Sequence, residues 1–138
     1  MAVLNLSARS VVTSGRLAHL ATIDPDGSPQ MSAVWVGLDG DDIVSAHLTG
    51  GRKVQNIARD PRVSLTMEAD GDNGIGMKDY LIVRGTARLE EGGAPVLLQR
   101  LAEVYVGPGV KFPPMDDPPP GTVIRITPTR VGGSGPWV

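Results

Sequence analysis

Residues 62–68 carry the clearest alternation of apolar and polar positions in the chain. Val63, Leu65 and Met67 alternate with polar side chains, and a period of two predicts a strand with one face on a core. Five further apolar-rich runs, bounded by Gly, Pro, Asp or charged residues, predict strands over residues 17–23, 29–38, 42–48, 77–89 and 122–128. The chain is therefore expected to be rich in β-structure.

Short turn signals separate the first three of these strands. Asp24-Pro25-Asp26-Gly27 supplies a proline that fixes φ and a glycine that tolerates positive φ, which predicts a β-hairpin. Asp39-Gly40-Asp41 turns the chain again before the third strand. The three strands are thus predicted to form an antiparallel meander.

A short helix is predicted between two chain breaks, Gly50-Gly51 and Asp60-Pro61. Val54, Ile57 and Ala58 recur at i, i+3 and i+4, the spacing of a core-facing helical stripe. Thr49 stands where an N-cap is expected. Proline at position 61 disfavours the helical region for the residue before it, so the helix should end there.

Two other helices and two loops complete the predicted elements. A short helix is predicted over residues 7–14, and a longer amphipathic helix over residues 94–106 with an apolar stripe of Val96, Leu97, Leu101 and Val104. Residues 69–76 and 107–121 are rich in Gly, Asp or Pro and are expected to form loops, and Gly85 is expected to mark a bulge.

Six strands, mostly neighbours in sequence, with short helices between them indicate a mainly β (α+β) fold. The architecture they favour is an antiparallel six-stranded barrel with short flanking helices. A length of 138 residues suits a single domain. With no internal repeat and no linker, residues 1–138 are expected to form one domain.

Composition excludes several classes of protein. A net charge of -2 and a pI of about 5.6 argue against a general nucleic-acid or membrane-surface binder. The chain has no cysteine, which excludes disulfides, thiolate chemistry and Cys-held metal clusters. No apolar run approaches the roughly 20 residues of a membrane span, and no signal peptide is evident. The expectation is a cytoplasmic protein with no nucleic-acid or membrane partner.

The most informative polar feature is Arg52-Lys53 at the start of the predicted short helix. Both cations fall in the first turn, where backbone N–H groups lack partners and the helix dipole is positive. An anion bound there would satisfy the amides and the cations together, and the two preceding glycines would let it approach closely. The sequence therefore favours a phosphate-sized site, the alternative being a solvated turn with two exposed cations.

Other candidate chemistry is sparse. His19 and His47 are the only histidines, they have no metal-ligand spacing, and His19 is expected to be a packed core residue. No G-x-S-x-G elbow and no Gly-rich nucleotide loop is present. No metal site is predicted and the catalytic residues stay unassigned, so a cofactor is expected to carry any difficult chemical step.

Four segments together resemble a known family: LATIDPDGSPQMSAVWV, GGRKVQNIARDPRVSL, YLIVRGTARL and VIRITPTRV. In this order they look like the pyridoxamine 5'-phosphate oxidase-like split β-barrel family, and more narrowly its members that use the deazaflavin coenzyme F420. The run R-K-x-x-N-x-x-R-D-P is the most specific part. The resemblance implies an FMN-binding split barrel type of fold and a homodimer with two cofactor sites at the subunit interface.

The resemblance also implies which residues hold the cofactor. Lys53, with Arg52 beside it, matches the phosphate ligand, although many relatives separate the Arg and the Lys by one residue. Residues expected at the ring or beside the phosphate turn are Gln30, Met31, Ser32, His47, Leu48, Thr49 and Asn56. For Asn56 the alternative is a structural role in holding the turn. Trp137 would cover the partner's site, or else be an exposed or dimer-packed terminal aromatic.

The implied reaction is hydride transfer from reduced F420 to a small unsaturated organic acceptor, with the loop 107–121 shaping the substrate mouth. Two alternatives stay open. One is an FMN-dependent oxidoreductase of the same fold, since both cofactors place a phosphate near the same turn. The other is a non-catalytic protein that binds a flavin or a tetrapyrrole, such as biliverdin or haem.

Overall fold

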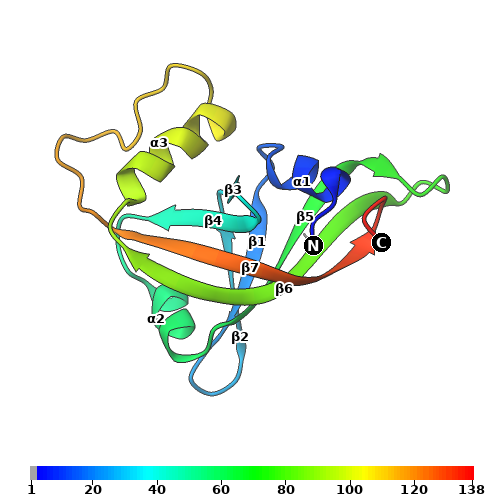
Figure 1. Cartoon of the computed structure of the whole chain (residues 1–138), viewed down its shortest axis with the longest axis horizontal. Helices are drawn as coiled ribbons and strands as arrows, with labels where there is room; N and C mark the ends of the chain where they lie inside the picture. The colour runs from blue at the N-terminus through cyan, green and yellow to red at the C-terminus, as the bar shows by residue number, and fades with distance from the viewer. Residues whose placement is uncertain (1–2) are drawn as a thin grey trace.

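Residues 3–138, which the computed structural model describes, form an antiparallel seven-stranded sheet with three short helices outside it (Figure 1). The strand order is β2-β1-β5-β6-β7-β4-β3, and the sheet curls without closing. The elements are α1 (Leu6–Val12), β1 (Ala18–Ile23), β2 (Pro29–Val34), β3 (Gly37–Asp39), β4 (Asp42–His47), α2 (Arg52–Arg59), β5 (Arg62–Asp72), β6 (Lys78–Glu91), α3 (Ala94–Tyr105) and β7 (Thr122–Ser134). The predicted mainly β, antiparallel barrel-like fold is confirmed.

The predicted strand over residues 29–38 is wrong in one respect, because it breaks into β2 and β3 and raises the strand count from six to seven. At the break, the N–H of Val36 donates to the hydroxyl of Tyr105 at 3.0 Å, so a side chain takes the place of a strand partner. Beyond the break the chain crosses to the other edge of the sheet. The two predicted antiparallel pairings are confirmed, as β1–β2 and β3–β4. The meander is wrong as one continuous set of three strands, because β2 and β3 lie at opposite edges and β4 also pairs with the distant β7.

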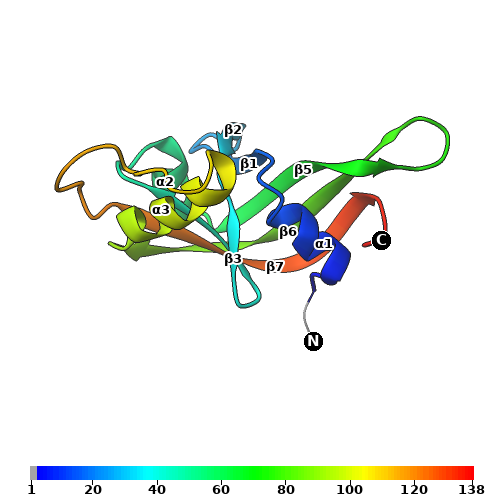
Figure 2. The same ribbon diagram turned by 90° about the horizontal axis from the view of Figure 1, so that it is seen from above.

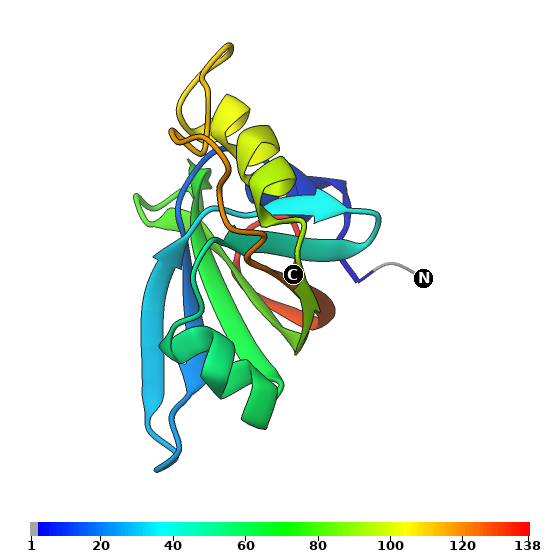
Figure 3. The same ribbon diagram turned by 90° about the vertical axis from the view of Figure 1, so that its left-hand side faces the viewer.

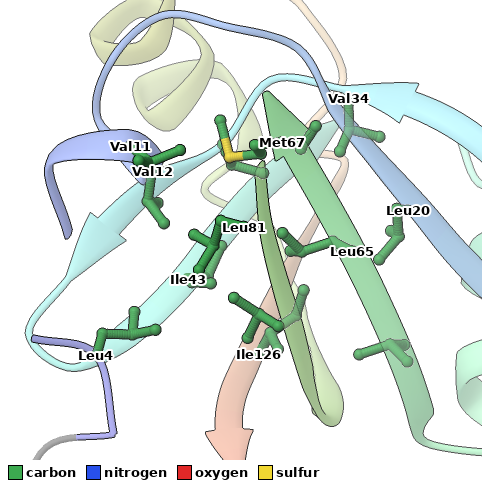
Figure 4. Packing of buried hydrophobic residues seen from close by; sticks show 14 of the residues in the cluster. Leu4, Val11, Val12, Leu20, Val34, Ile43, Leu65, Met67, Leu81 and Ile126 are labelled. Carbon is green, nitrogen blue, oxygen red and sulfur yellow. The ribbon is translucent and has the colours of Figure 1, made fainter. Parts of the chain in front are cut away.

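The main core fills the inner face of the curled sheet. Apolar side chains from β1, β4, β5, β6 and β7 converge there, and α1 covers one end (Figure 4). The alternation predicted for residues 62–68 is confirmed, since Val63, Leu65 and Met67 are all buried. Leu20, Ile43 and Leu81 are fully buried in the same cluster.

Helix α3 packs on the outer face of β4 and builds a second, smaller core with Val44, Ala46 and Val123. Its predicted apolar stripe is partly wrong: Leu101 is buried, but Val96 and Val104 are 79% and 54% exposed. The residues that face the sheet are Ala94, Leu98, Leu101 and Ala102. Small alanines let the helix approach the strand closely, so packing rather than summed hydrophobicity selects the buried face.

Residues 107–121 are irregular, as predicted, but α3 holds part of this loop in place. The amide of Gln99 donates to the carbonyl of Val110 at 2.6 Å and accepts from the N–H of Phe112 at 2.8 Å. The Phe112 ring lies 5.1 Å from the Trp35 ring, which stacks on Tyr105 at 5.3 Å. An aromatic group of three residues therefore fixes the loop over the end of β2.

Strands β5, β6 and β7 run longer than predicted and project as a twisted ribbon from the body of the sheet (Figure 2). Residues 69–72 belong to β5, and β7 continues to Ser134. The predicted irregularity at Gly85 is confirmed by a register shift against β7, where a Cβ would lie 2.4 Å from the carbonyl oxygen of Thr127. No helix within residues 3–138 is long and apolar enough to cross a membrane.

Candidate anion-binding site

A hollow of about 230 Å³ lies between the ends of β2 and β4, the start of α2 and the buried face of α3. Figure 3 shows α2 and α3 on opposite sides of β4, so the strand that precedes α2 passes between the two helices. The hollow is lined by Ala33, Val34, Trp35, Ala46, His47, Lys53, Leu98 and Phe112. Two residues predicted at the cofactor, His47 and Lys53, are thus brought together. We call this space the Lys53 hollow.

Helix α2 begins without a side-chain cap. Its N-cap is Gly51, in extended backbone, and the first intrahelical bond runs from the N–H of Gln55 to the carbonyl of Gly51. The prediction of Thr49 as N-cap is wrong, and the Thr49 side chain is exposed. The N–H groups of the first turn therefore lack intramolecular partners within the described part of the chain, which leaves a partial positive charge there.

Lys53 is half-buried and, among residues 3–138, forms no hydrogen bond or ion pair. Burial lowers the pKa of its ammonium, because desolvation disfavours the charged form. A cation in an apolar hollow without a counterion is unfavourable in the unliganded protein. A bound anion would therefore stabilise the charged form of Lys53.

Arg52 takes a different direction. Its guanidinium lies 3.7 Å from a carboxylate oxygen of Asp24 in the β1–β2 turn, and the side chain is 70% exposed. It does not line the hollow. Of the two adjoining cations, the structure therefore places only Lys53 in the hollow.

His47 is the second basic group in the hollow. Burial, with a smaller contribution from the charge of Lys53, lowers the pKa of its imidazole from 6.5 to about 4. Its Nε2 lies 3.0 Å from the hydroxyl of Ser45, which shares the inner face of β4. The imidazole is therefore neutral at pH 7 and is held in one orientation.

We expect the depressed pKa of His47 to make the protein less stable in acid. The unfolded chain binds this proton near pH 6.5 and the folded chain near pH 4, so acidification between these values favours unfolding. From pH 7.5 to 4.5 this single group should remove about 2–3 kcal/mol of unfolding free energy. Urea denaturation at both pH values should show a smaller loss for His47→Gln; an equal loss in the two proteins would contradict this.

The Asn56 side chain is fully buried and braces the β1–β2 turn. Its Nδ2 donates to Thr22 Oγ1 and to Asp24 Oδ1, both at 3.0 Å, and its Oδ1 accepts from Arg59 at 3.1 Å. These bonds give Asn56 a structural role in holding the turn, which was the alternative to cofactor binding for this residue. A direct contact with a cofactor stays a prediction.

The other predicted residues divide by position. Gln30 accepts from Thr22 Oγ1 at 2.7 Å, Met31 is 56% exposed, and Ser32 has a buried hydroxyl without a partner in the described chain. Leu48 packs toward α3. Trp137 is buried in its own chain, where its indole N–H donates to the carbonyl of Gly132 at 3.0 Å. The C-terminus, one residue beyond Trp137, lies near α1 and away from α2 (Figure 1).

Four residues in or beside the hollow were not predicted from the sequence. Ser45 could have been found, because period two places it on the same face of the strand as His47. Trp35, Leu98 and Phe112 meet only through tertiary packing. His19 was expected in the core, but it is exposed on the outer face of β1.

A larger hollow, of about 430 Å³, lies beside the start of α3 and does not include Lys53. Its two cations are both engaged, Arg125 with Asp39, Asp42 and Glu90, and Arg100 with the carbonyl of Leu38. The carboxylates of Asp39, Glu90 and Glu91 also line it, so it is less suited to an anion than the smaller hollow. No group of three potential metal ligands occurs within residues 3–138.

Comparison with known proteins identifies a family for this chain. Residues 7–134 match the sequence model of a family described as pyridoxamine 5'-phosphate oxidase. Among solved structures, the chain is similar to an F420 reductase at 29% identity, with a TM-score of 0.75 over 94% of this chain and 98% of that one. A conserved hypothetical protein from Mycobacterium tuberculosis is 30% identical, with a TM-score of 0.74 over 94% and 83% of the two chains.

More distant structures share the fold. A heme binding protein from Mycobacterium smegmatis is 22% identical, with a TM-score of 0.63 over 92% of this chain and 52% of that chain. No curated protein sequence gave a significant match.

Proposed function

Because the chain belongs to the pyridoxamine 5'-phosphate oxidase family, we propose that it is an oxidoreductase that uses the deazaflavin coenzyme F420 to reduce a small unsaturated organic acceptor. The observation that carries the proposal is Lys53, a half-buried cation without a counterion at the uncapped start of α2. Similarity to an F420 reductase over nearly the whole chain supports the choice of coenzyme.

The residues present fit a phosphate-bearing cofactor. Lys53 and the free N–H groups of the first turn of α2 would bind the phosphate, and Gly50 and Gly51 leave open space beside it. Arg52 is directed to Asp24 and would not contact the phosphate in this arrangement. The segment Gln30–Ser32 of β2 would lie against the ring.

When bound, the reduced deazaflavin supplies the hydride. The protein's own contribution is to orient the reactants and to exclude water, which the apolar walls formed by Trp35, Leu98 and Phe112 would do. The anchored loop that carries Phe112 would border the acceptor. His47 is neutral at pH 7, so it is not a ready proton donor in the unliganded protein, and the accompanying proton would come from solvent.

FMN is the second candidate cofactor. The resemblance to the pyridoxamine 5'-phosphate oxidase family allows it, and Lys53 would bind the phosphate of either cofactor. The test is a fluorescence titration of the purified protein with F420 and with FMN side by side. Tighter binding of F420, followed by oxidation of reduced F420 with a panel of enones, quinones and biliverdin, would support the proposal. Saturable binding without turnover would indicate a non-catalytic flavin- or tetrapyrrole-binding protein instead.

We also propose a homodimer, since proteins of this family are commonly dimeric. Strand register places mostly uncharged side chains on the outer face of β1, β2, β5 and β6: His19, Ala21, Met31, Ala33, Ser64, Thr66, Tyr80 and Ile82. The same face also carries the charged side chains Arg62, Glu68 and Arg84. Ala33 also lines the Lys53 hollow, so a partner on this face would border the cofactor. Sedimentation should give a dimer for the natural chain and a monomer for Ala21→Arg; a monomer in both would contradict the dimer.

Substituting Gly50 should separate binding from stability. A Cβ at this position meets no atom within 4 Å, and its φ does not require glycine. Gly50→Val should therefore change the unfolding free energy by less than about 0.5 kcal/mol, yet weaken cofactor binding because the side chain fills the approach to α2. Gly50→Ala should have a smaller effect on affinity. Undiminished affinity of the valine variant would place the phosphate elsewhere.

A further inference from the structure

The Lys53 hollow contains one permanent positive charge. Lys53 is the only charged side chain among the described residues that line it. The neighbouring cation, Arg52, is directed to Asp24, and Arg59 bonds to Asn56 and to the carbonyl of Ile23. Lys53 would therefore balance an anion that carries a single negative charge, in addition to the partial positive charge of the free N–H groups of α2.

His47 is the one group in the hollow that can add a second charge. The elements packed around it contribute apolar side chains, Ala33 and Val34 from β2, Leu98 from α3 and Phe112 from the loop, while α2 contributes Lys53. No carboxylate faces the imidazole among these residues. It is neutral without a ligand because burial and Lys53 both oppose its protonation, and a bound anion would remove the second of these effects.

The Ser45 hydroxyl can form a hydrogen bond with either protonation state of this histidine. Its hydroxyl lies 3.0 Å from Nε2 and is buried. A hydroxyl can donate to a neutral ring nitrogen or, after rotation, accept from a protonated one. The imidazole can therefore gain a proton at Nε2 without losing its hydrogen-bond partner.

We propose that the Lys53 hollow selects a singly charged phosphodiester, and that a doubly charged phosphomonoester binds there only when His47 takes up one proton. This rests on the proposed function, in which the hollow holds the cofactor phosphate. An uncompensated charge in a desolvated site is costly, so Lys53 alone balances a diester but not a monoester dianion. The phosphate of F420 is a diester and that of FMN a monoester, so charge selection favours the deazaflavin.

The experiment compares FMN with its monomethyl phosphate ester, which has the same ring and ribityl chain but a diester phosphate. At pH 7.5 the monoester is mostly a dianion, because its second pKa is about 6. Calorimetric titrations in two buffers of different ionisation enthalpy measure the protons exchanged on binding. We expect FMN to take up about one proton and its affinity to fall about tenfold per pH unit above pH 7, and the methyl ester to show neither effect.

His47→Gln identifies the group that gains the proton. We expect this variant to take up no proton with either ligand, and to lose more affinity for FMN than for the methyl ester. Uptake that persists in the variant would place the proton elsewhere and overturn the role of His47. Equal affinity for the two ligands with no uptake, or failure of both to bind to a natural protein that binds F420, would overturn the inference alone. Failure of F420 to bind as well would overturn the proposed function with it.

Discussion

Lys53→Ala should weaken binding of the phosphate-bearing cofactor by roughly 10- to 150-fold. A charge-assisted hydrogen bond to phosphate contributes about 1.5–3 kcal/mol, and each 1.4 kcal/mol is tenfold in affinity. Lys53 is the cation that the fold directs into the hollow, whereas Arg52 lies beside Asp24. Fluorescence titration at low salt measures the change.

The stability of the same variant is an independent readout. Burial of the Lys53 ammonium without a counterion is unfavourable in the free protein, so Lys53→Ala should leave the unfolding free energy unchanged or raise it. Lys111→Ala is the matched control, because it makes the same change in net charge at an exposed lysine paired only with Asp116. Unaltered affinity in Lys53→Ala, or an equal loss in Lys111→Ala, would contradict the assigned role.

Gly121→Ala should destabilise the protein by about 2–5 kcal/mol. Gly121 has a φ of +63, and its Cβ would lie 2.3 Å from the carbonyl oxygen of His47 and 2.6 Å from the Cβ of Ala94. A left-handed conformation costs a side chain about 1–2 kcal/mol, and forced overpacking adds about 1–3 kcal/mol. The clash also displaces the end of β4, so the affinity of the hollow should fall as well.

Gly109→Ala separates these two costs. Its φ of +80 is also left-handed, but a Cβ there meets nothing within 4 Å. Urea denaturation should therefore show a loss of only about 1–2 kcal/mol for Gly109→Ala. Equal losses of unfolding free energy in the two variants would mean that the end of β4 moves to accommodate the added methyl group without an energetic cost.

Features determined by near neighbours in the chain could be predicted from the sequence. The turn at Asp24–Gly27 forms as expected, with Gly27 at a φ of +88. Breaks at Gly51 and Asp60 bound α2 as expected. Lys53 and His47 share one hollow because a short turn joins the end of β4 to the start of α2.

Features determined by distant pairing could not be predicted. Residues 33–36, where the run 29–38 breaks, are uniformly apolar, and only the Tyr105 hydroxyl, far along the chain, reveals the break. Packing against β4 decides which side of α3 faces the sheet. The positions of the valines within α3 do not indicate that side. Phe112 reaches the site only because Gln99 holds the loop that carries it.

The ladder between β4 and β7 has a consequence for the order of folding. His47 pairs with Thr122 and Ile43 with Ile126, so the strand that leads to Lys53 gains its long partner only after most of the chain has been synthesised. Loop closure over such a separation is slow compared with hairpin formation. On the ribosome, the β1–β2 hairpin can form early, whereas binding of a cofactor should appear only once β7 has left the exit tunnel.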